Sequence, residues 1–323
     1  MNNSINKNEV LENTTPVEDF IWLVLIDGTV KINYYDGDDE KVVIPAEIDG
    51  KRVTEIGKFA FADCNWITSV IIPDSVTTIG DGAFSDCELI KSMNIPESVT
   101  TIGDGAFDNC TSLSSINIPE GVTVIGGYTF EYCSSLTSIT IPAGVTEIGE
   151  CAFYGCEQLT SINIPEGVTV IEAGAFKNCT ALTSVTISEG VTEIGECAFE
   201  NCTSLSSINL PDSVTEIGDS AFYECKALTS INIPDGVTLI GDNTFFGCKS
   251  LSSINIPDGV AEIGTRAFYG CKSFTSITVP DSVKVIKQFA FRECTSLTSI
   301  KLPDDAYKGV GLLMGTPLVP KGK

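Results

Sequence analysis

Residues 205–227 read LSSINLPDSVTEIGDSAFYECKA, and residues 228–250 repeat the pattern as LTSINIPDGVTLIGDNTFFGCKS. The pattern recurs every 23 residues, and a cysteine near the end of each unit marks the period. The eleven cysteines of this series are Cys64, Cys87, Cys110, Cys133, Cys156, Cys179, Cys202, Cys225, Cys248, Cys271 and Cys294. A fixed period of this length is typical of a solenoid, in which each unit forms one coil that stacks on the next. The period therefore predicts one elongated repeat domain rather than the two globular domains that 323 residues usually form.

Each part of the unit predicts a different side of the coil. The Ser-Ile-Asn-Ile stretch alternates polar and apolar residues, as a half-buried strand does, and the proline after it ends the strand. The Val-Thr-x-Ile stretch forms a second short extended side, and the glycine after it, as at Gly57, Gly80 and Gly103, suits a corner at positive φ. The Ala-Phe-x-x-Cys stretch is long enough for one helical or 3-10 turn. The fold class predicted is a right-handed coil with a parallel β-sheet on one face and short turns on the other.

The unit L-x-x-I-x-I-P-x-x-V-T-x-I-G-x-x-A-F-x-x-C resembles the 23-residue leucine-rich repeat of BspA-like bacterial and protozoan surface proteins. The resemblance extends from near Val42 to Asp304. It implies a curved solenoid with the sheet on its concave face and, for some members, adhesion to host or matrix proteins or to other microbes. It implies no catalytic residue and no cofactor.

The two ends of the chain depart from the repeat. Residues 1–16 are polar and are predicted to be a disordered tail. Within 17–41, the apolar run 20–26, the pair Asp27-Gly28 and the run 29–32 predict a β-hairpin with a type I′ turn that caps the solenoid of residues 42–304. The first unit carries five extra residues, 46–50, which suit a larger turn. Residues 305–323 form a short C-terminal cap or tail, in which Leu312, Leu313, Met314, Leu318 and Val319 are expected to fold over the last coil.

Composition narrows the function. The chain has 43 acidic and 19 basic residues, a net charge of −24, and therefore lacks the positive surface that nucleic acids require. It has no histidine, which excludes Ser-His and Cys-His catalysis and the commonest zinc ligand. Its carboxylates recur identically in each unit, whereas catalysis by carboxylates needs one unlike pair. We therefore expect neither an enzyme nor a protein that binds nucleic acid.

The cysteine column is expected to hold buried free thiols that pack as small apolar side chains. Disulfides between some coils and a metal site are the alternatives, although no Cys-x-x-Cys pair exists to support a metal. Cys151 and Cys197 lie outside the series, and we expect them to be more exposed and to react first.

Acidic residues follow the proline in almost every unit and form a ridge. Turn formation and solubility explain this ridge, and a calcium site is the sharper alternative. Its candidate ligands are Asp212, Asp235, Asp258 and Asp281.

Two other columns are candidate partner surfaces. The outward face of the main strand carries Asn117, Asn163, Asn209, Asn232 and Asn255, which either form hydrogen-bonded ladders or line a flat docking surface. Tyr223, Phe246 and Tyr269 follow the repeat phenylalanine in three consecutive units and predict a short apolar strip.

The function predicted is a non-catalytic interaction or adhesion module that binds a protein or a glycan through its solenoid surface. A structural spacer or self-assembling rod, with end-to-end association, is the alternative. The resemblance to this family implies a cell-surface or extracellular location. The sequence shows no signal peptide, wall anchor or membrane-inserting segment, and its free thiols would suit the cytoplasm.

Overall fold

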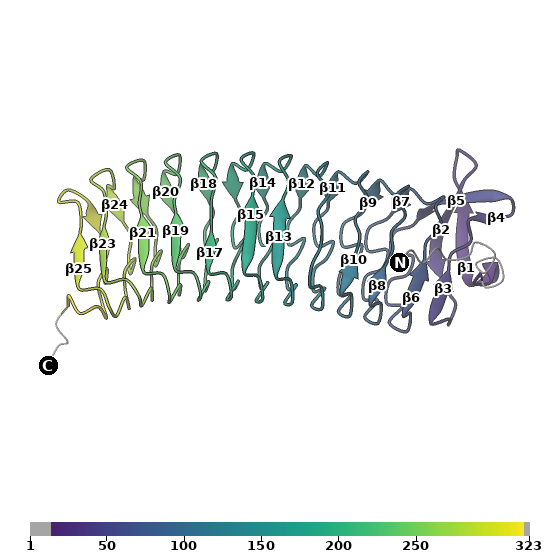
Figure 1. Ribbon diagram of the computed structural model, residues 1–323, viewed down its shortest axis with the longest axis horizontal. Coiled ribbons are helices and arrows are strands. Elements are labelled where there is room, and N and C mark those ends of the chain that lie inside the picture. The colour runs from purple at the N-terminus through teal and green to yellow at the C-terminus, as the bar shows by residue number, and fades with distance from the viewer. Residues whose placement is uncertain (1–13, 320–323) are drawn as a thin grey trace, which may run out of the picture.

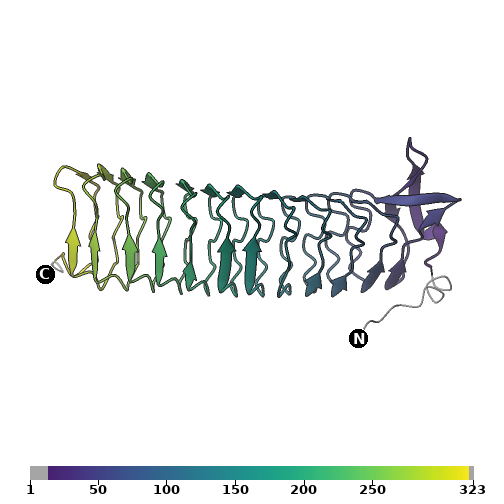
Figure 2. The ribbon, with the colours of Figure 1, turned by 45° about the horizontal axis from the view of Figure 1, so that its top comes forward.

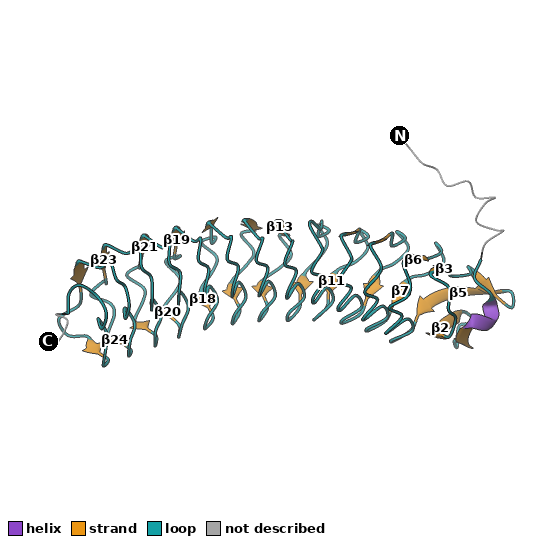
Figure 3. Cartoon of the chain, turned by 90° about the horizontal axis from the view of Figure 1, so that it is seen from below, coloured by secondary structure: helices purple, strands orange, loops and turns teal. Residues whose placement is uncertain are grey.

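The computed structural model describes residues 14–319, which form a long, gently curved stack of coils with a β-hairpin at its N-terminal end (Figure 1). Two rows of short parallel strands run along the stack on different sides of each coil, and turns join them (Figures 2 and 3). The prediction of a repeat solenoid with parallel strands and an N-terminal hairpin cap is confirmed.

The first row comes from the Ser-Ile-Asn-Ile stretches. Where its strands pair, the partners are 23 residues apart, as at Ile231 and Ile254, except that β3 and β6 pair 28 residues apart because of the five-residue insertion. Its strands are β3 (Lys41–Val43), β6 (Ser69–Ile71), β8 (Ser92–Met93), β10 (Ser115–Ile116), β13 (Ser161–Ile164), β15 (Ser184–Ile187), β17 (Ser207–Ile208), β19 (Ser230–Asn232), β21 (Ser253–Asn255), β23 (Ser276–Thr278) and β25 (Ser299–Lys301).

The second row comes from the Val-Thr-x-Ile stretches, as in the pair Ile194 and Ile217. Its strands are β2 (Val30–Tyr35), β5 (Lys51–Ile56), β7 (Thr78–Ile79), β9 (Thr101–Ile102), β11 (Val124–Ile125), β12 (Glu147–Ile148), β14 (Val170–Ile171), β16 (Glu193–Ile194), β18 (Glu216–Ile217), β20 (Leu239–Ile240), β22 (Glu262–Ile263), β24 (Val285–Ile286) and β26 (Tyr307–Lys308).

The N-terminal cap joins this second row. A 3-10 helix (Val17–Asp19) leads into β1 (Phe20–Val24), which pairs antiparallel with β2, and β2 pairs parallel with β5. The predicted type I′ turn is wrong at this hairpin. Only Gly28 in the loop has a positive φ, and Leu25 N–H donates to the Thr29 carbonyl at 2.8 Å, so the loop has three residues rather than two.

A second hairpin occupies the five-residue insertion of the first unit. Here β4 (Glu47–Ile48) pairs antiparallel with β5. Asp49 and Gly50 both have positive φ, at 51° and 72°. Two consecutive left-handed residues are what a type I′ turn requires, so that turn is formed at the insertion.

The prediction of a disordered tail over residues 1–16 is wrong for its last three residues, which belong to the described part of the chain. Residues 1–13 lie outside the described part of the chain. Thr15 is buried, and its hydroxyl accepts a hydrogen bond from Val43 N–H at 2.9 Å.

The inner core is a stack of phenylalanine rings, one from each coil, which we call the inner column. Its ring centroids are 5.1 to 5.7 Å apart, and the planes of neighbouring rings lie within 16° of each other. Tyr35 of the cap extends the stack at 5.3 Å from Phe61. The members are Phe61, Phe84, Phe107, Phe130, Phe153, Phe176, Phe199, Phe222, Phe245, Phe268 and Phe291.

The Ala-Phe-x-x-Cys turn is not helical, which corrects the prediction of a helical or 3-10 turn. Two residues of each turn are left-handed: one precedes the alanine and one precedes the cysteine, as at Ser220 (φ 58°) and Glu224 (φ 55°). Left-handed residues interrupt any helix of L-amino acids. The left-handed residues also orient alternate N–H groups of the turn toward the next coil. Phe222 N–H, for example, donates to the Thr244 carbonyl of the next coil at 3.0 Å.

The corner glycine has a different function from the one predicted. Gly57, Gly80 and Gly103 do not have positive φ. Instead, the coils approach so closely that a side chain would clash: a Cβ on Gly195 would lie 2.8 Å from the backbone nitrogen of Ala173. Glycine is therefore needed there for backbone contact between coils rather than for a left-handed corner.

The C-terminal end is a partial coil. β26 pairs with β24, and Phe291 N–H donates to the Leu312 carbonyl as inner-column residues do to each next coil. Leu312 is buried and Leu313 packs against the core, as predicted. The expectation for the other three side chains is wrong, because a single partial turn cannot cover them. The exposed three are Met314, Leu318 and Val319.

Candidate functional site

The residues directly after the inner-column phenylalanines form what we call the outer column. Ten of them are half-buried, and Ser85 is buried. Unlike the inner column, the outer column changes in composition from coil to coil. Its members are Ala62, Ser85, Asp108, Glu131, Tyr154, Lys177, Glu200, Tyr223, Phe246, Tyr269 and Arg292.

Neighbours in the outer column interact along the stack. Burial raises the pKa of Glu131 to about 6, and the charge of Asp108 adds to this increase. Further along, the Lys177 ammonium lies 6.0 Å from the centre of the Tyr154 ring and 3.0 Å from a Glu200 oxygen. The side chains of this column therefore form contacts with one another rather than only with the core.

The three predicted aromatic residues lie in one row in this column, and we call them the aromatic strip. The rings of Tyr223 and Phe246 stack at 4.7 Å, as do those of Phe246 and Tyr269. The Arg292 guanidinium lies 5.9 Å from the Tyr269 ring and covers the C-terminal face of the row. Because the ring faces cover one another, the half-buried strip presents ring edges to solvent.

A hollow of about 380 Å³ lies beside the aromatic strip, and we call it the glycine notch. Phe246 and Tyr269 line it together with Gly247 and Gly270, which occupy the left-handed position before the cysteine at φ 70° and 71°. No Cβ occupies that position in these two coils. The space above Gly270 is open, so ring edges stay accessible there, whereas the Glu224 carboxylate lies over Gly247.

Lysines border the notch, and the sequence reasoning did not single them out. Lys226, Lys249 and Lys272 follow the repeat cysteine in the same three units as the aromatic strip. Lys249 and Lys272 are exposed and line the notch. The sequence did contain a signal for them: three consecutive units each carry an aromatic residue after the phenylalanine and a lysine after the cysteine.

The five asparagines of the asparagine column differ in burial and hydrogen bonding. Asn117 is half-buried, and its side chain makes two hydrogen bonds with the backbone of Ile95 in the preceding coil, at 2.8 and 2.9 Å. The other four are exposed, and no hydrogen bond joins one asparagine of this column to the next within residues 14–319. Those four are Asn163, Asn209, Asn232 and Asn255.

The acidic ridge is a line of exposed side chains with one carboxylate per coil, except in the coil that carries Ala143. The four calcium candidates are all exposed, and none is brought together with the others in a cage. Across the described residues, no group of three or more acidic or cysteine side chains is close enough to hold a metal ion. The four are Asp212, Asp235, Asp258 and Asp281.

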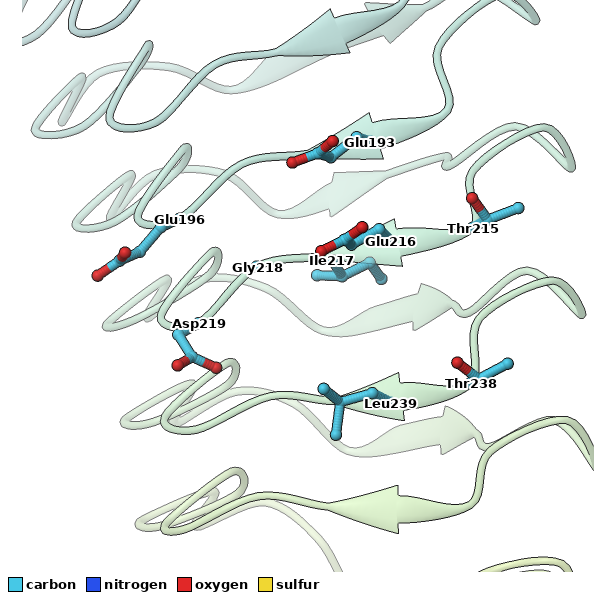
Figure 4. Close-up of a pocket in the computed structure, with 9 residues that line it drawn as sticks. All are labelled: Glu193, Glu196, Thr215, Glu216, Ile217, Gly218, Asp219, Thr238 and Leu239. Atoms are coloured by element: carbon cyan, nitrogen blue, oxygen red, sulfur yellow. The ribbon is translucent and has the colours of Figure 1, made fainter.

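The second strand row carries a different acidic surface, a hollow of about 540 Å³ between three coils (Figure 4). Glu193 and Glu216 project from β16 and β18, and Glu196 and Asp219 lie on the turns that follow them. Burial and the neighbouring Glu216 charge raise the pKa of Glu193. No basic side chain lines this hollow.

The thirteen cysteines are free, as expected, and eleven of them are buried. In the repeat column, each thiol from Cys87 onward donates to the phenylalanine carbonyl of the preceding coil, as Cys179 Sγ does to the Phe153 oxygen at 3.2 Å. Burial raises the pKa of Cys197 to about 12. Cys151 and Cys197 are only half-buried, so they are the more accessible thiols, but each forms less thiolate than an ordinary cysteine.

The stacked coils, the 23-residue register and the constant inner column define a β-solenoid of the leucine-rich repeat class. The family description "BspA type leucine rich repeat region" matches residues 40–160, 123–249 and 215–308. The chain belongs to this family.

Solved structures of bacterial proteins share the fold. A leucine rich cell surface protein from Faecalibacterium prausnitzii is 32% identical, with a TM-score of 0.55, and the match covers 90% of this chain and 94% of that one. A leucine-rich repeat protein from Bacteroides ovatus is 27% identical, with a TM-score of 0.51 and coverage of 94% and 92%. Among curated protein sequences, none matches the chain. In the described residues, no helix has the length and apolar character needed to cross a membrane.

Proposed function

We propose that this protein is a non-catalytic interaction module that binds a protein partner through the outer column, with the aromatic strip as the central contact. The observation that carries the proposal is the strip itself: three stacked aromatic side chains occupy consecutive positions of a column whose other members are mostly charged or small. Aromatic residues and arginine are the side chains that dominate binding energy at protein interfaces, and Arg292 closes this row.

The family supports the same proposal. Leucine-rich repeats of this type are typical of proteins that bind other proteins or lie at the cell surface. The similar Faecalibacterium protein is a cell surface protein. We extend this to an adhesion function at a cell surface. A glycan partner fits the strip less well, because its ring faces are covered by one another and by Arg292.

The test is capture of the purified chain by an array of immobilised extracellular-matrix proteins and defined glycans. We expect at least one matrix protein to retain the chain, and we expect the double variant Phe246→Ala/Tyr269→Ala to bind it at least about tenfold more weakly. Asn209→Ala/Asn232→Ala, which alters the first strand row instead of the turns, is the matched control and should bind as the unaltered chain does. Retention by glycans alone, or equal loss in both variants, would contradict the proposal.

A self-assembling rod is the second candidate function, and the C-terminal partial coil favours it. Tyr307, Val310 and Met314 are exposed there, at 65%, 69% and 47% of their surface. Stacking of another chain on this end would bury them. Light scattering of the chain with and without residues 305–323 tests this function, since end-to-end assembly requires the larger species to disappear when the segment is removed.

A further inference from the structure

We propose that the glycine notch is a docking site for an acidic polypeptide segment that carries an apolar side chain. The proposal rests on the function proposed above and names the chemistry of the partner. The apolar side chain would enter the notch over Gly270 and contact the edges of Phe246 and Tyr269, and carboxylates on either side of it would pair with Lys249 and Lys272.

The net charge differs between two parts of the rod, and the notch lies in the part whose net charge is positive. Residues 59–225 contain 23 acidic residues and only two lysines, a net charge of −21. Residues 226–323 contain eight acidic and eleven basic residues, a net charge of +3. An acidic partner is therefore repelled by most of the rod and attracted only near its C-terminal third, which favours docking there.

The charges around the notch leave two lysines available. The notch is bordered at its ends by Glu224 and Glu293, which would repel an acidic segment if they were free. Each has a cation of its own: Lys226 lies 3.2 Å from Glu224, and Arg292 lies 3.8 Å from Glu293. Within residues 14–319, Lys249 and Lys272 have no carboxylate oxygen within ion-pair distance.

The shape of the notch selects the apolar side chain. At the position before the cysteine, other coils carry Asn109, Asn178 and Asn201, all left-handed like Gly270. A Cβ on Gly270 would meet no atom closer than 3.9 Å, so the space above this glycine is open. Ring edges line that space, and an aliphatic or aromatic group from a partner would remove both surfaces from water.

The experiment uses isothermal titration calorimetry on the full chain with three blocked peptides of equal length. One alternates aspartate with leucine, the second alternates lysine with leucine, and the third alternates aspartate with serine. We expect only the aspartate-leucine peptide to bind measurably, and we expect its affinity to fall as salt rises from roughly 0.05 to 0.5 M. Equal binding of the lysine-leucine peptide or of the aspartate-serine peptide would overturn the proposal.

Two variants locate the binding. Lys249→Glu/Lys272→Glu should weaken binding of the aspartate-leucine peptide at least about tenfold, whereas Lys41→Glu/Lys91→Glu makes the same change in net charge at exposed sites elsewhere and should leave the affinity unchanged. Gly270→Asn fills the notch with a residue that other coils hold in the same conformation, and should weaken binding to a similar extent. Equal affinities of the two lysine variants would overturn the proposal.

The remaining outcomes separate this inference from the function it rests on. If the array partner is lost with Phe246→Ala/Tyr269→Ala but retained by Gly270→Asn, the proposed function stands and the notch proposal fails. If sedimentation shows that the chain self-associates and Lys249→Glu/Lys272→Glu abolishes this, the acidic middle of a second copy occupies the site, and the proposal of a foreign segment also fails.

Discussion

Each outer-column residue directly follows an inner-column phenylalanine in the sequence, yet residue identity is constant in the inner column and variable in the outer column. The inner column holds phenylalanine in each of eleven units, and each ring is fully buried; every ring except the terminal Phe291 lies between two other rings. The outer column holds alanine, serine, acids, bases and aromatic residues. Both columns stack side chains at the spacing of the coils, at 5.1 to 5.7 Å inside and 4.7 Å in the aromatic strip.

The difference shows which positions of a repeat protein can vary without disturbing the fold. A buried side chain must fit the same neighbours in each coil, so substitution in the inner column leaves a void or a clash. A side chain in the outer column has solvent on one side and can change without disturbing the stack. Departures from the repeat in the outer column are therefore the place to look for binding specificity.

Removal of one ring from each column gives the largest expected contrast. Phe176→Ala leaves a cavity in the middle of the inner column and should lower the free energy of unfolding by about 3 to 5 kcal/mol. Phe246→Ala removes a half-buried ring and should cost less than about 1.5 kcal/mol. Urea unfolding followed by circular dichroism measures both. Similar losses for the two variants would show that the columns do not differ in the way described.

The cysteine column provides a smaller contrast. Cys179→Ala loses the hydrogen bond to the Phe153 carbonyl and a buried sulfur, which should cost about 1 to 2 kcal/mol. Cys197→Ala, at a half-buried site outside the series, should change stability by less than about 0.5 kcal/mol. The same unfolding measurement decides, and a native-state thiol titration should detect at most two of the thirteen thiols.

The smallest expected effect concerns Glu131 of the outer column, whose pKa rises from 4.5 when unfolded to about 6 when folded. Folding disfavours its ionised form, so the stability penalty is absent below pH 4.5, grows between pH 4.5 and 6, and is complete above pH 6. Glu131→Gln should therefore stabilise the protein at pH 7, by less than about 1 kcal/mol, and leave it unchanged at pH 4.

The control for this prediction is Glu147→Gln, which removes the same charge from an exposed position on β12. Thermal unfolding at both pH values compares the two variants. A gain from Glu131→Gln that is the same at pH 4 and pH 7 would show that burial of the charge is not its cause.

The fold could be predicted from the sequence because the period itself places equivalent residues side by side. Tyr223, Phe246 and Tyr269 had to be neighbours once each coil was known to contain 23 residues. The same reasoning applies to the buried cysteines. Any property that depends only on which residues share a column was within reach.

Backbone geometry within the coil was not within reach. A glycine that recurs from unit to unit, such as Gly195, has two explanations, positive φ and close backbone approach, and only the structure distinguishes them. The pairs Asp27-Gly28 and Asp49-Gly50 have the same sequence, yet only Asp49-Gly50 forms the type I′ turn. The glycine notch was also missed, because its signal is two side chains that are lacking from a variable column.

The hydrogen bonds between coils have a mechanical consequence. Phenylalanine N–H groups donate to the next coil and cysteine thiols to the preceding one, so these bonds run along the length of the rod. A pulling force applied between the two ends loads the terminal coils first, because each coil is held only by its neighbours. Each coil that peels away releases 23 residues, or roughly 75 Å of extended chain. The rod would thus lengthen under tension in equal steps while the coils that remain keep their shape.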